Sequence, residues 1–488
     1  MLFGRKYLQG ETTRSYMSHE IPMKNAENIA FFIGILYYIK NNIILRGDHL
    51  IRRSIVNDLI SWKDSKRRKP LLLTGVRQCG KTYTVKEFGR EYFKNTVYIN
   101  FEAQSSLGTI FDHDLDVKRI IGEIELMTGE RIHIGSTLLF LDEIQSCPSA
   151  ITALKYFCED MRELHIIAVG SLLGVALNRE NISFPVGKIN RLTMYPVNFY
   201  EFAVAEGYEN ILKLLSEWEF SREIPEQYMH IFTKTLKEYF IVGGMPEAVD
   251  SYLTDRDFGE VDDIQGEILT DYADDFSKYT TPIEAEKIRW IWNSVPVQLA
   301  KENNKFIFSH VKAGKRAKDL EDSLNWLNDS GLVRKLELVE NPEHPLSGMA
   351  DTTYFKLYMS DVGLLRKRAG LSPLVILNES GNYIEFKGAL TENFVMNELV
   401  MMGKEPFFWR SSNTAELDFI YEDGENIVPV EVKSADNVMA KSYRNYCRKY
   451  NPNIGYKLSL KNMAENMCGN TRTVNLPLFM IWRLGGNK

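Results

Sequence analysis

Short, uninterrupted apolar runs alternate with amphipathic segments through the first part of the chain. These runs predict strands at 71–74, 96–101, 137–141 and 165–169, because each is long enough for a strand and too short for a helix. Strands that are apolar throughout are typical of a parallel sheet covered by helices on both faces. The pattern therefore predicts an α/β fold in which ligands bind at the carboxyl ends of the strands.

The most specific pattern follows the first of these strands. Residues 75–82 read Gly-Val-Arg-Gln-Cys-Gly-Lys-Thr and lead into a helical pattern. Such a strand, loop and helix would surround a phosphate with backbone N–H groups at a helix N-terminus; a chance glycine turn is the alternative. The residues expected to hold a nucleotide are Gly75, Val76, Arg77, Gln78, Cys79, Gly80, Lys81, Thr82 and Tyr83. The pattern predicts that the chain binds ATP or a related triphosphate.

Several side chains near this loop have expected roles in phosphate chemistry. Lys81 would reach the β- and γ-phosphates, and the Thr82 hydroxyl would bind Mg²⁺. Asp142 and Glu143 end the third predicted strand, where Asp142 would hold Mg²⁺ and Glu143 would polarise the attacking water. An acidic pair at a strand end is usually only a solvated turn. Together with the phosphate loop, however, this pair predicts ATP hydrolysis.

Three more residues are candidates for contact with the γ-phosphate. Ser171 ends the fourth strand, where it would either sense the γ-phosphate or cap the following turn. Lys188 and Arg191 are candidates for the cation that stabilises transition-state charge, within the same chain or on a neighbouring copy. The alternative for both is a surface or packing role.

Beyond residue 196 the pattern becomes helical, with helices predicted at 199–215 and 228–240. Amphipathic helices from 284 onward are followed by two strand-like runs at 332–338 and 354–359. Helices followed by a two-stranded ribbon favour a winged-helix module. From about residue 390 the chain returns to a helix and then to strands.

These motifs resemble the AAA-family ATP-binding proteins of prokaryotes, which carry a C-terminal domain of uncharacterised function. The resemblance rests on the phosphate loop, the strand from 138 to 145 with its Asp-Glu pair, the strand end at 169–171 and the run from 192 to 202. It continues through 243–246, 355–365 and 390–395. It covers the chain from Leu50 onward and implies an ATP-binding protein and ATPase whose biological substrate is open.

A second set of carboxylates lies in the C-terminal part. Asp418 lies in one predicted strand, and Glu431 and Lys433 share a face of the next strand because side chains alternate. With Glu392 on the preceding helix, they could bind Mg²⁺ and position a water for phosphodiester attack. The order of elements resembles the PD-(D/E)XK nuclease fold. A degenerate version, or charges that simply face water, is the alternative.

The charge composition of the chain bears on which macromolecules it could bind. The chain has 488 residues, a net charge of −6 and 25% charged residues, so no global basic excess indicates nucleic acid. A local basic segment at 441–450 contains Lys441, Arg444, Arg448 and Lys449 among three tyrosines, and is either a phosphate-binding or a solvated helix face. DNA, RNA and a second copy of the chain are therefore the candidate macromolecular partners.

The cysteines and the N-terminal segment indicate the cellular compartment in which the protein is expected. Five scattered cysteines without C-x-x-C spacing predict neither a disulfide framework nor a zinc site, and they favour a reducing compartment. The apolar run at 29–39 is too short to span a membrane, and acidic residues precede it. We expect a cytoplasmic protein without a membrane partner.

The sequence predicts five parts. They are an N-terminal extension at 1–48, a P-loop ATPase core at 49–205, a helical lid or linker at 206–283, a winged-helix-like region at 284–365 and an α+β PD-(D/E)XK-like domain at 366–488. Three functions are compatible with them: an ATP-driven switch or motor, an ATP-regulated metal-dependent nuclease, and a nucleotide-binding scaffold with little turnover.

Overall fold

The computed structural model describes residues 51–171, 185–301, 305–378, 384–411, 415–433 and 441–485. The N-terminal extension predicted at 1–48 lies outside these residues. Within the described ranges, no helix has the length and apolar character that crossing a membrane requires.

The first sheet is fully parallel and has the strand order β2-β3-β4-β1-β5. Its strands are β1 (Leu71–Thr74), β2 (Asn95–Asn100), β3 (Thr137–Asp142), β4 (His165–Val169) and β5 (Asn190–Thr193). The first four are the strands predicted from the apolar runs, to within one residue. The sequence did not indicate β5, because this edge strand is short and only alternate residues are shielded from solvent.

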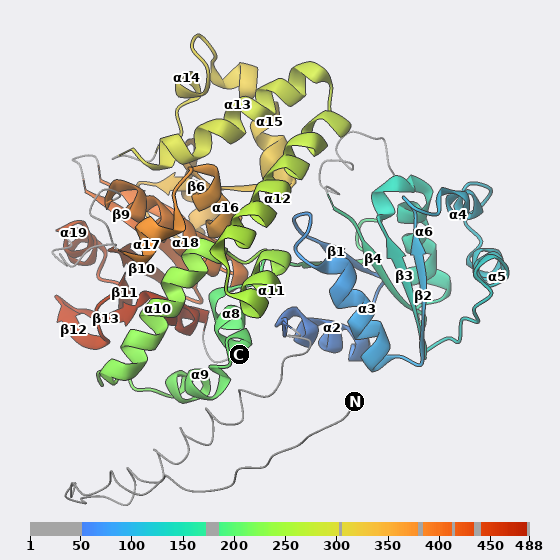
Figure 1. Cartoon of the computed structure of the whole chain (residues 1–488), viewed down its shortest axis with the longest axis horizontal. Coiled ribbons are helices and arrows are strands. Elements are labelled where there is room, and N and C mark those ends of the chain that lie inside the picture. The colour runs from blue at the N-terminus through green and yellow to red at the C-terminus, as the bar shows by residue number, and fades with distance from the viewer. Residues whose placement is uncertain are drawn as a thin grey trace, which may run out of the picture. The chain divides into compact units, whose positions relative to one another are not determined.

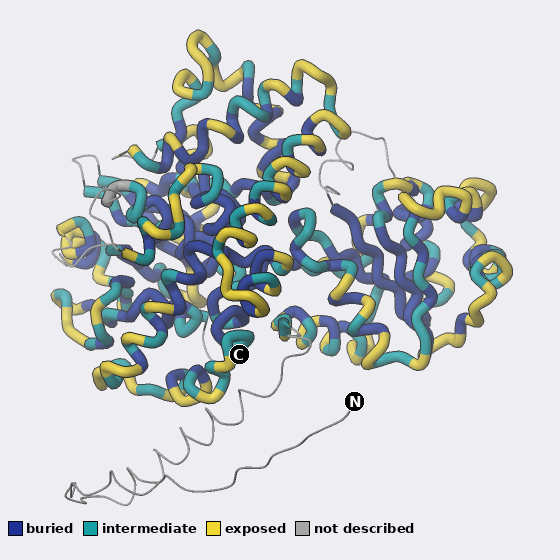
Figure 2. The backbone as a smooth tube through the Cα atoms, in the orientation of Figure 1, coloured by how far each residue is buried: buried dark blue, intermediate teal, exposed yellow. Residues whose placement is uncertain are grey.

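Helices cover both faces of this sheet, as predicted (Figure 1). Leu71 and Leu73 pack with α2 (Ile55–Asp64) and α3 (Lys81–Tyr92), whereas Leu72 between them packs on the opposite face with α5 (Val117–Thr128) and α6 (Pro148–Asp160). Three short helical turns lie on the same face as α5 and α6: α4 (Ser105–Gly108), η1 (Thr109–Phe111) and η2 (Ile144–Ser146). The central strands are consequently buried from end to end (Figure 2).

A helical region follows the sheet. Its helices are α8 (Phe199–Ala205), α9 (Glu209–Ser216), α10 (Glu226–Val242), α11 (Pro246–Asp255), α12 (Phe258–Lys278) and α13 (Pro282–Leu299). The single helix predicted at 199–215 is therefore two helices. They are separated around Gly207, which has a positive φ of 90°.

The second sheet is mixed and has eight strands in the order β12-β13-β11-β10-β9-β8-β6-β7. The strands are β6 (Val333–Val339), β7 (Ala350–Met359), β8 (Phe407–Arg410), β9 (Glu416–Asp423), β10 (Asn426–Val432), β11 (Ile454–Ser459), β12 (Ala464–Cys468) and β13 (Thr471–Pro477). The helical segments in this part are α14 (Phe308–Val311), α15 (Ala317–Asp329), η3 (Leu346–Met349), α16 (Val362–Arg368), α17 (Pro373–Leu377), α18 (Ile384–Met401), α19 (Lys441–Tyr450) and η5 (Leu478–Gly485).

The ribbon expected in a separate winged-helix module is part of this larger sheet. β6 and β7 form the antiparallel ribbon, but β6 also pairs in parallel with β8, through Leu338 and Phe408. An edge strand with unpaired N–H and C=O groups recruits another strand readily. The ribbon thus joins the C-terminal sheet, although the strand pattern alone gave it no partner beyond itself.

Two glycine-containing segments far apart in the sequence meet where the helical region contacts the C-terminal part. The Asp361 carboxylate accepts hydrogen bonds from the N–H groups of Gly244 (2.6 Å) and Leu364 (2.8 Å). A side chain at Gly244 is impossible without rearrangement, because its Cβ would lie 2.1 Å from the carbonyl oxygen of Val197. The turn at 243–246 is therefore a packing junction.

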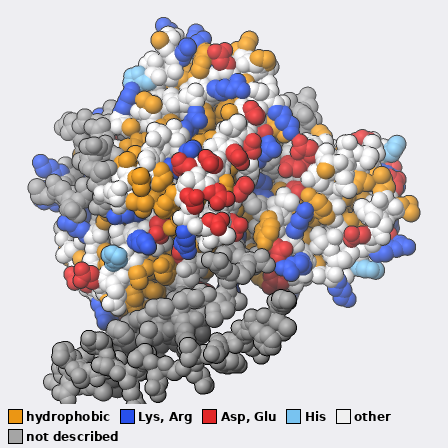
Figure 3. Space-filling view, in the orientation of Figure 1, with side chains coloured by type: hydrophobic (Ala, Val, Ile, Leu, Met, Phe, Trp, Pro, Cys, Tyr) orange, Lys and Arg blue, Asp and Glu red, His pale blue; other side chains and the backbone are white. Residues whose placement is uncertain are grey.

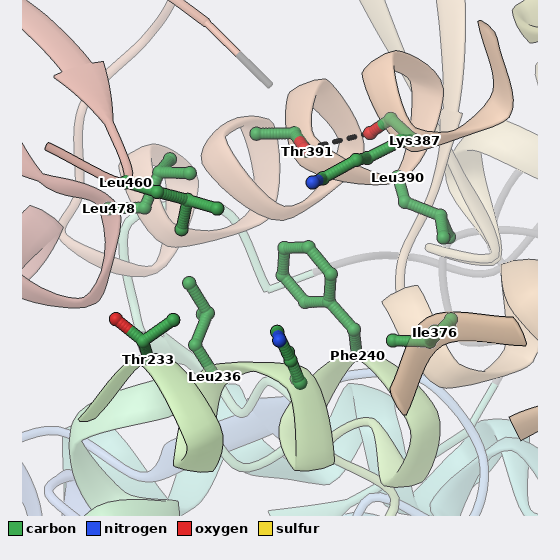
Figure 4. A pocket seen from close by; sticks show the side chains of 10 residues that line it. Thr233, Leu236, Phe240, Ile376, Lys387, Leu390, Thr391, Leu460 and Leu478 are labelled. Atoms are coloured by element: carbon green, nitrogen blue, oxygen red, sulfur yellow. Dashed lines mark hydrogen bonds between the residues drawn. The ribbon is translucent and has the colours of Figure 1, made fainter. Parts of the chain in front are cut away.

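A small apolar pocket lies between α10, α17 and α18 (Figure 4). Leu236 and Phe240 line one side and Leu390 the other, and the Thr391 hydroxyl donates back to the Lys387 carbonyl at 2.7 Å. Its volume of about 30 Å³ is room for roughly one water molecule. We interpret it as a packing gap.

Glu398 of α18 contacts the first residue of α8, and its burial predicts that the stability of the fold depends on pH. Its carboxylate is buried and accepts a hydrogen bond from the Phe199 N–H at 2.8 Å, and burial raises its pKa to about 8. As the pH rises above the pKa of an unfolded Glu, only the unfolded chain ionises at this position, so folding stability falls until about pH 8.

Glu398→Gln keeps the carbonyl acceptor for Phe199 and removes this cost. We expect the free energy of unfolding to rise by about 1 to 3 kcal/mol at pH 8 and to change little at pH 5. Urea unfolding at the two pH values measures the difference, with the exposed Glu405→Gln as the control. An equal effect at both pH values would contradict the prediction.

Candidate functional site

The phosphate loop connects β1 to α3 and has the backbone shape that the motif requires. Gly75 has a φ of 145°, and Gly80, which precedes α3, has a φ of 93°. The Lys81 ammonium is buried and donates to the carbonyl oxygens of Gly75 (3.0 Å) and Val76 (2.7 Å). The lysine is therefore folded over the loop, where phosphate oxygens would offer it stronger, charged acceptors.

Asp142 and Thr82 lie together, as predicted. The Thr82 hydroxyl donates to Asp142 Oδ2 at 3.0 Å, and the Tyr98 hydroxyl donates to the same oxygen at 3.0 Å. Tyr98 lies on the adjacent strand β2, and its ring carries the Lys86 ammonium 4.0 Å from the centroid. The sequence gave no reason to select Tyr98.

Glu143 and Ser171 also meet. The Ser171 hydroxyl donates to Glu143 Oε2 at 3.3 Å, and the Gln145 side-chain amide donates to the same oxygen at 2.5 Å. Glu143 itself has a positive φ of 50°, so the carboxylate follows a sharp turn directly after β3. These contacts bring the four polar candidates of the first sheet to one edge.

Helix α12 contacts the phosphate loop directly. Arg77 forms an ion pair with the buried Asp275, and the Tyr272 hydroxyl donates to the Arg77 carbonyl at 2.9 Å. The Gln78 side-chain amide donates to Asp271 at 2.8 Å. Burial raises the pKa of Asp275, while the Arg77 guanidinium opposes this shift. Two residues of the loop are thereby attached to the helical region.

Arg53, which no sequence motif indicates, forms a hydrogen bond with the backbone of the phosphate loop. Its guanidinium donates to the Cys79 carbonyl (3.1 Å), the Tyr195 carbonyl (2.5 Å) and the Glu201 carboxylate (3.1 Å). Glu201 also completes a capping box with Asn198 at the start of α8. The N-x-x-E spacing could have identified Glu201 as a cap, but Arg53 carries no local signal.

The two candidates for an added cation lie elsewhere in the first domain. Lys188 forms an ion pair with Glu159 of α6 at 2.8 Å. Arg191 lies on the edge strand β5 and lines a cavity of about 320 Å³ together with Arg53 and residues 400–403 at the end of α18. The role of either residue at a γ-phosphate stays a prediction.

The C-terminal candidates converge, and the structure adds two more residues to them. We call this set the carboxylate–lysine cluster; its members are Glu392, Glu416, Asp418, Glu431, Lys356 and Lys433. Lys433 contacts Glu431 at 2.6 Å, and Lys356 contacts Glu416 at 2.7 Å and Glu392 at 3.5 Å. Lys356 was missed because β7 is distant in sequence from β9 and β10. Glu416 lies on β9 two residues before Asp418, so the alternation of side chains along that strand could have identified it.

The members of the cluster lie close enough to shift one another's pKa values. Burial raises the pKa of Asp418 far above its usual range, and the neighbouring Glu431 and Glu392 raise it further. Burial likewise raises the pKa of Glu431. Burial alone would lower the pKa of Lys356. Its pKa is nevertheless raised, because three carboxylates lie nearby, those of Glu392, Glu416 and Asp418. Within the described residues, however, no group of three or more His, Cys, Asp or Glu side chains is arranged to hold a metal ion.

Two of the three tyrosines of the basic helix α19 lie away from its basic surface. Tyr443 and Tyr446 are buried against Trp409 and Leu417 under the sheet. Arg444 and Arg448 are exposed. Tyr443 and Tyr446 therefore belong to the core, whereas Tyr450 is partly exposed and has the Lys449 ammonium 4.8 Å from its ring centroid.

A parallel sheet with a phosphate loop after β1 and Asp-Glu at the end of β3 defines a P-loop nucleotide-binding domain. A family model described as an AAA domain matches residues 67–203, the part of the chain that contains the phosphate loop and the first sheet. Models described as domains of unknown function, DUF8612 and DUF4143, match residues 233–374 and 387–479. The predicted combination of an AAA domain with an uncharacterised C-terminal domain is confirmed.

Among solved structures, a Walker-type ATPase of Pyrococcus abyssi is 15% identical with a TM-score of 0.41, and the match covers 65% of this chain and 96% of that one. The ORC1 protein of Aeropyrum pernix in complex with DNA is 12% identical with a TM-score of 0.28, covering 67% and 93%. Cdc6p from Pyrobaculum aerophilum is 11% identical with a TM-score of 0.25, covering 70% and 98%. No curated protein sequence gives a significant match.

Proposed function

We propose that this protein is a Mg²⁺-dependent ATPase whose nucleotide state is transmitted to its helical and C-terminal parts, as a switch or motor. The observation that carries the proposal is the direct attachment of α12 to the phosphate loop through Arg77 and Gln78. A phosphate that binds this loop and shifts its residues would also shift their contacts with α12, so the nucleotide state and the position of the helix would be coupled.

The residues present fit the magnesium that such a site uses. The Thr82 and Asp142 oxygens are 3.0 Å apart, close to the spacing of about 3 Å between neighbouring oxygens around an octahedral ion with 2.0–2.1 Å bonds. Both are oxygen donors of the kind Mg²⁺ prefers. When bound, the ion would neutralise charge on the β- and γ-phosphates.

The chain's own groups supply the remaining steps. Loop N–H groups and Lys81 would bind the phosphates, and Glu143 would orient a water for attack on the γ-phosphate. Gln145 and Ser171 support this role of Glu143, because both hold its carboxylate in place. Ser171 would also sense the γ-phosphate. Lys188 or Arg191, in the same chain or in a second copy, would supply the added cation.

The switch proposal predicts that Asp275 transmits the nucleotide signal. We expect ATP to change hydrogen exchange along α12 in the wild type, because phosphate oxygens compete with Asp275 for the Arg77 guanidinium. Asp275→Asn should at least halve this ATP-dependent change, as measured by hydrogen-exchange mass spectrometry. Asp274→Asn, an exposed neighbour with the same charge change, is the matched control. An unaltered ATP response in Asp275→Asn would refute this route.

DNA or RNA remains a proposed partner of this ATPase, and the charge distribution limits where it can bind. Acidic side chains gather over α11 and α12 (Figure 3), and those of α12 include the exposed Glu260, Asp263, Glu267, Asp271 and Asp274. Phosphate backbones are repelled there, so the exposed arginines of α19 are the better candidate surface.

ATP hydrolysis assayed with and without DNA and RNA, with nucleic-acid integrity checked in the same tubes, tests the proposal. Phosphate release that nucleic acid stimulates, without cutting, supports an ATP-driven switch. If the wild-type protein releases phosphate no faster than the Glu143→Gln variant, the ATPase proposal fails and a nucleotide-binding scaffold with little turnover is the function that fits.

A second candidate function, an ATP-regulated metal-dependent nuclease, is favoured by the convergence of the carboxylate–lysine cluster. Helix α18, strand β9 with Asp418 and strand β10 with Glu431 and Lys433 follow the order of the PD-(D/E)XK resemblance. Glu392 would complete the metal site only if it were released from Lys356. These roles are proposals.

The nuclease candidate predicts Mg²⁺-dependent cutting that Lys433→Ala lowers by about 100-fold, because the ammonium next to Glu431 would no longer stabilise charge on the attacked phosphate. Gel analysis of labelled DNA and RNA measures this loss. Lys404→Ala, which breaks an ion pair with Asp423 on the same sheet, is the control. Cutting that persists in Lys433→Ala would come from a contaminant or another site.

A further inference from the structure

The most unusual feature of the carboxylate–lysine cluster is a fully buried lysine at its centre. The Lys356 side chain is only 2% exposed, and its ammonium lies 2.7 Å from Glu416 Oε1 and 3.5 Å from Glu392 Oε2. Tyr358, two residues along β7, donates to Glu392 Oε2 at 2.8 Å and fixes that carboxylate beside the ammonium. A buried ammonium is stable only when carboxylates pair with it.

The remaining carboxylates of the cluster are less well satisfied. Asp418 Oδ2 accepts from the Val432 N–H at 2.7 Å, and Glu431 Oε1 contacts Lys433. Glu431 is 3% exposed, and its second oxygen, Oε2, has no hydrogen-bond partner among the described residues. A buried oxygen without a partner costs free energy and is an acceptor available to a cation.

The cluster also has two more carboxylates than lysines. A divalent cation would balance that difference once all four carboxylates have lost their protons, but such an ion needs several oxygens at once. Lys356 already takes one oxygen each from Glu416 and Glu392, and its positive charge would repel a second cation in a region of low dielectric. The cluster is thus divided into a half filled by the buried Lys356 and a half in which Lys433 pairs with one oxygen of Glu431 and leaves the other without a partner.

We propose that Lys356 is the resident cation of this cluster and determines whether a divalent metal can bind there. With Lys356 in place, Asp418 and Glu431 alone face an incoming ion and hold it weakly. Without Lys356, Glu392 and Glu416 become available and the cluster becomes a divalent-metal site. The proposal concerns metal binding and stands whether or not the protein hydrolyses ATP or cuts nucleic acid.

Mn²⁺ binding to the full-length protein tests this directly, measured by the loss of the free Mn²⁺ electron paramagnetic resonance signal. All proteins carry Asp142→Asn, so that Asp142 near the phosphate loop does not contribute. We expect Lys356→Met to bind one Mn²⁺ at least tenfold more tightly than its parent. Lys356→Arg, which keeps the positive charge, should bind like the parent. Adding Glu416→Gln to Lys356→Met should remove most of the gain.

Lys335→Met on the neighbouring strand β6 controls for loss of a lysine outside the cluster, and should leave Mn²⁺ binding unchanged. If Lys356→Met does not fold, Lys356→Gln keeps a donor for Glu416 while removing the charge, and it should show the same gain. The proposal is overturned if a folded Lys356→Met or Lys356→Gln binds Mn²⁺ no more tightly than the parent. It is equally overturned if Lys356→Arg shows the gain.

Discussion

Glu143→Gln is expected to lower the rate of ATP hydrolysis by about 100-fold or more while leaving ATP affinity within about threefold. Glutamine has the same size and can accept the hydrogen bonds from Ser171 and Gln145, so the turn after β3 is preserved. It cannot accept a proton from water, and this is the only function removed. Phosphate release and equilibrium binding of a fluorescent ATP analogue measure the two quantities.

The controls for this prediction separate binding from turnover. Lys81→Ala removes the buried ammonium of the phosphate loop and should abolish binding and hydrolysis together. The exposed Glu130→Gln should change neither. If Glu143→Gln hydrolyses ATP at the wild-type rate, Glu143 does not orient the water, and another group must be sought among the neighbours of Asp142.

Gly75→Ala is expected to have the largest effect of any single methyl group added to the loop. Its Cβ would lie 2.1 Å from the Met194 carbonyl oxygen, and its φ of 145° is unfavourable for any residue with a Cβ. The strain and the clash should lower the stability of the first domain by about 2 kcal/mol or more and weaken ATP binding at least tenfold.

Gly122→Ala is the matched control for this change. Gly122 lies within α5, and a Cβ there would meet nothing within 4 Å. Alanine is the better helix former, so the free energy of unfolding should rise by about 0.5 to 1 kcal/mol. Thermal unfolding and ATP-analogue binding measure both variants. A Gly75→Ala protein that binds ATP normally would mean that Met194 and the loop can move apart easily.

The local patterns of the sequence were sufficient for the first domain. Three of the runs became the buried strands β1, β3 and β4, because a strand covered on both faces is apolar almost throughout. The remaining run became the partly buried edge strand β2. The other edge strand, β5, was missed because it has only four residues, of which alternate ones are exposed. The winged-helix ribbon was predicted as strands correctly, but its pairing with β8 was not, since pairing between distant segments leaves no mark in either one.

In the candidate sites, too, residues that belong to a local motif were predicted, and residues brought in from distant segments were not. Asp142, Thr82 and Glu143 were found because each belongs to a motif with fixed spacing, and the structure brings them together. The C-terminal carboxylates also converge, but the sequence could not show that Lys356 lies among them. Arg53 was missed for the same reason, because it acts on Cys79, Tyr195 and Glu201 across many residues of chain.

The sequence by itself determined the phosphate loop, the strand and helix on either side of it and the polar residues that end the neighbouring strands, because these depend on short-range periodicity and spacing. Only the tertiary structure decided that α12 holds Arg77, that the ribbon belongs to the C-terminal sheet and that a lysine fills the carboxylate cluster. Those outcomes depend on which distant surfaces pack and pair. Packing is decided by complementary shape and charge across the fold, which no local pattern records.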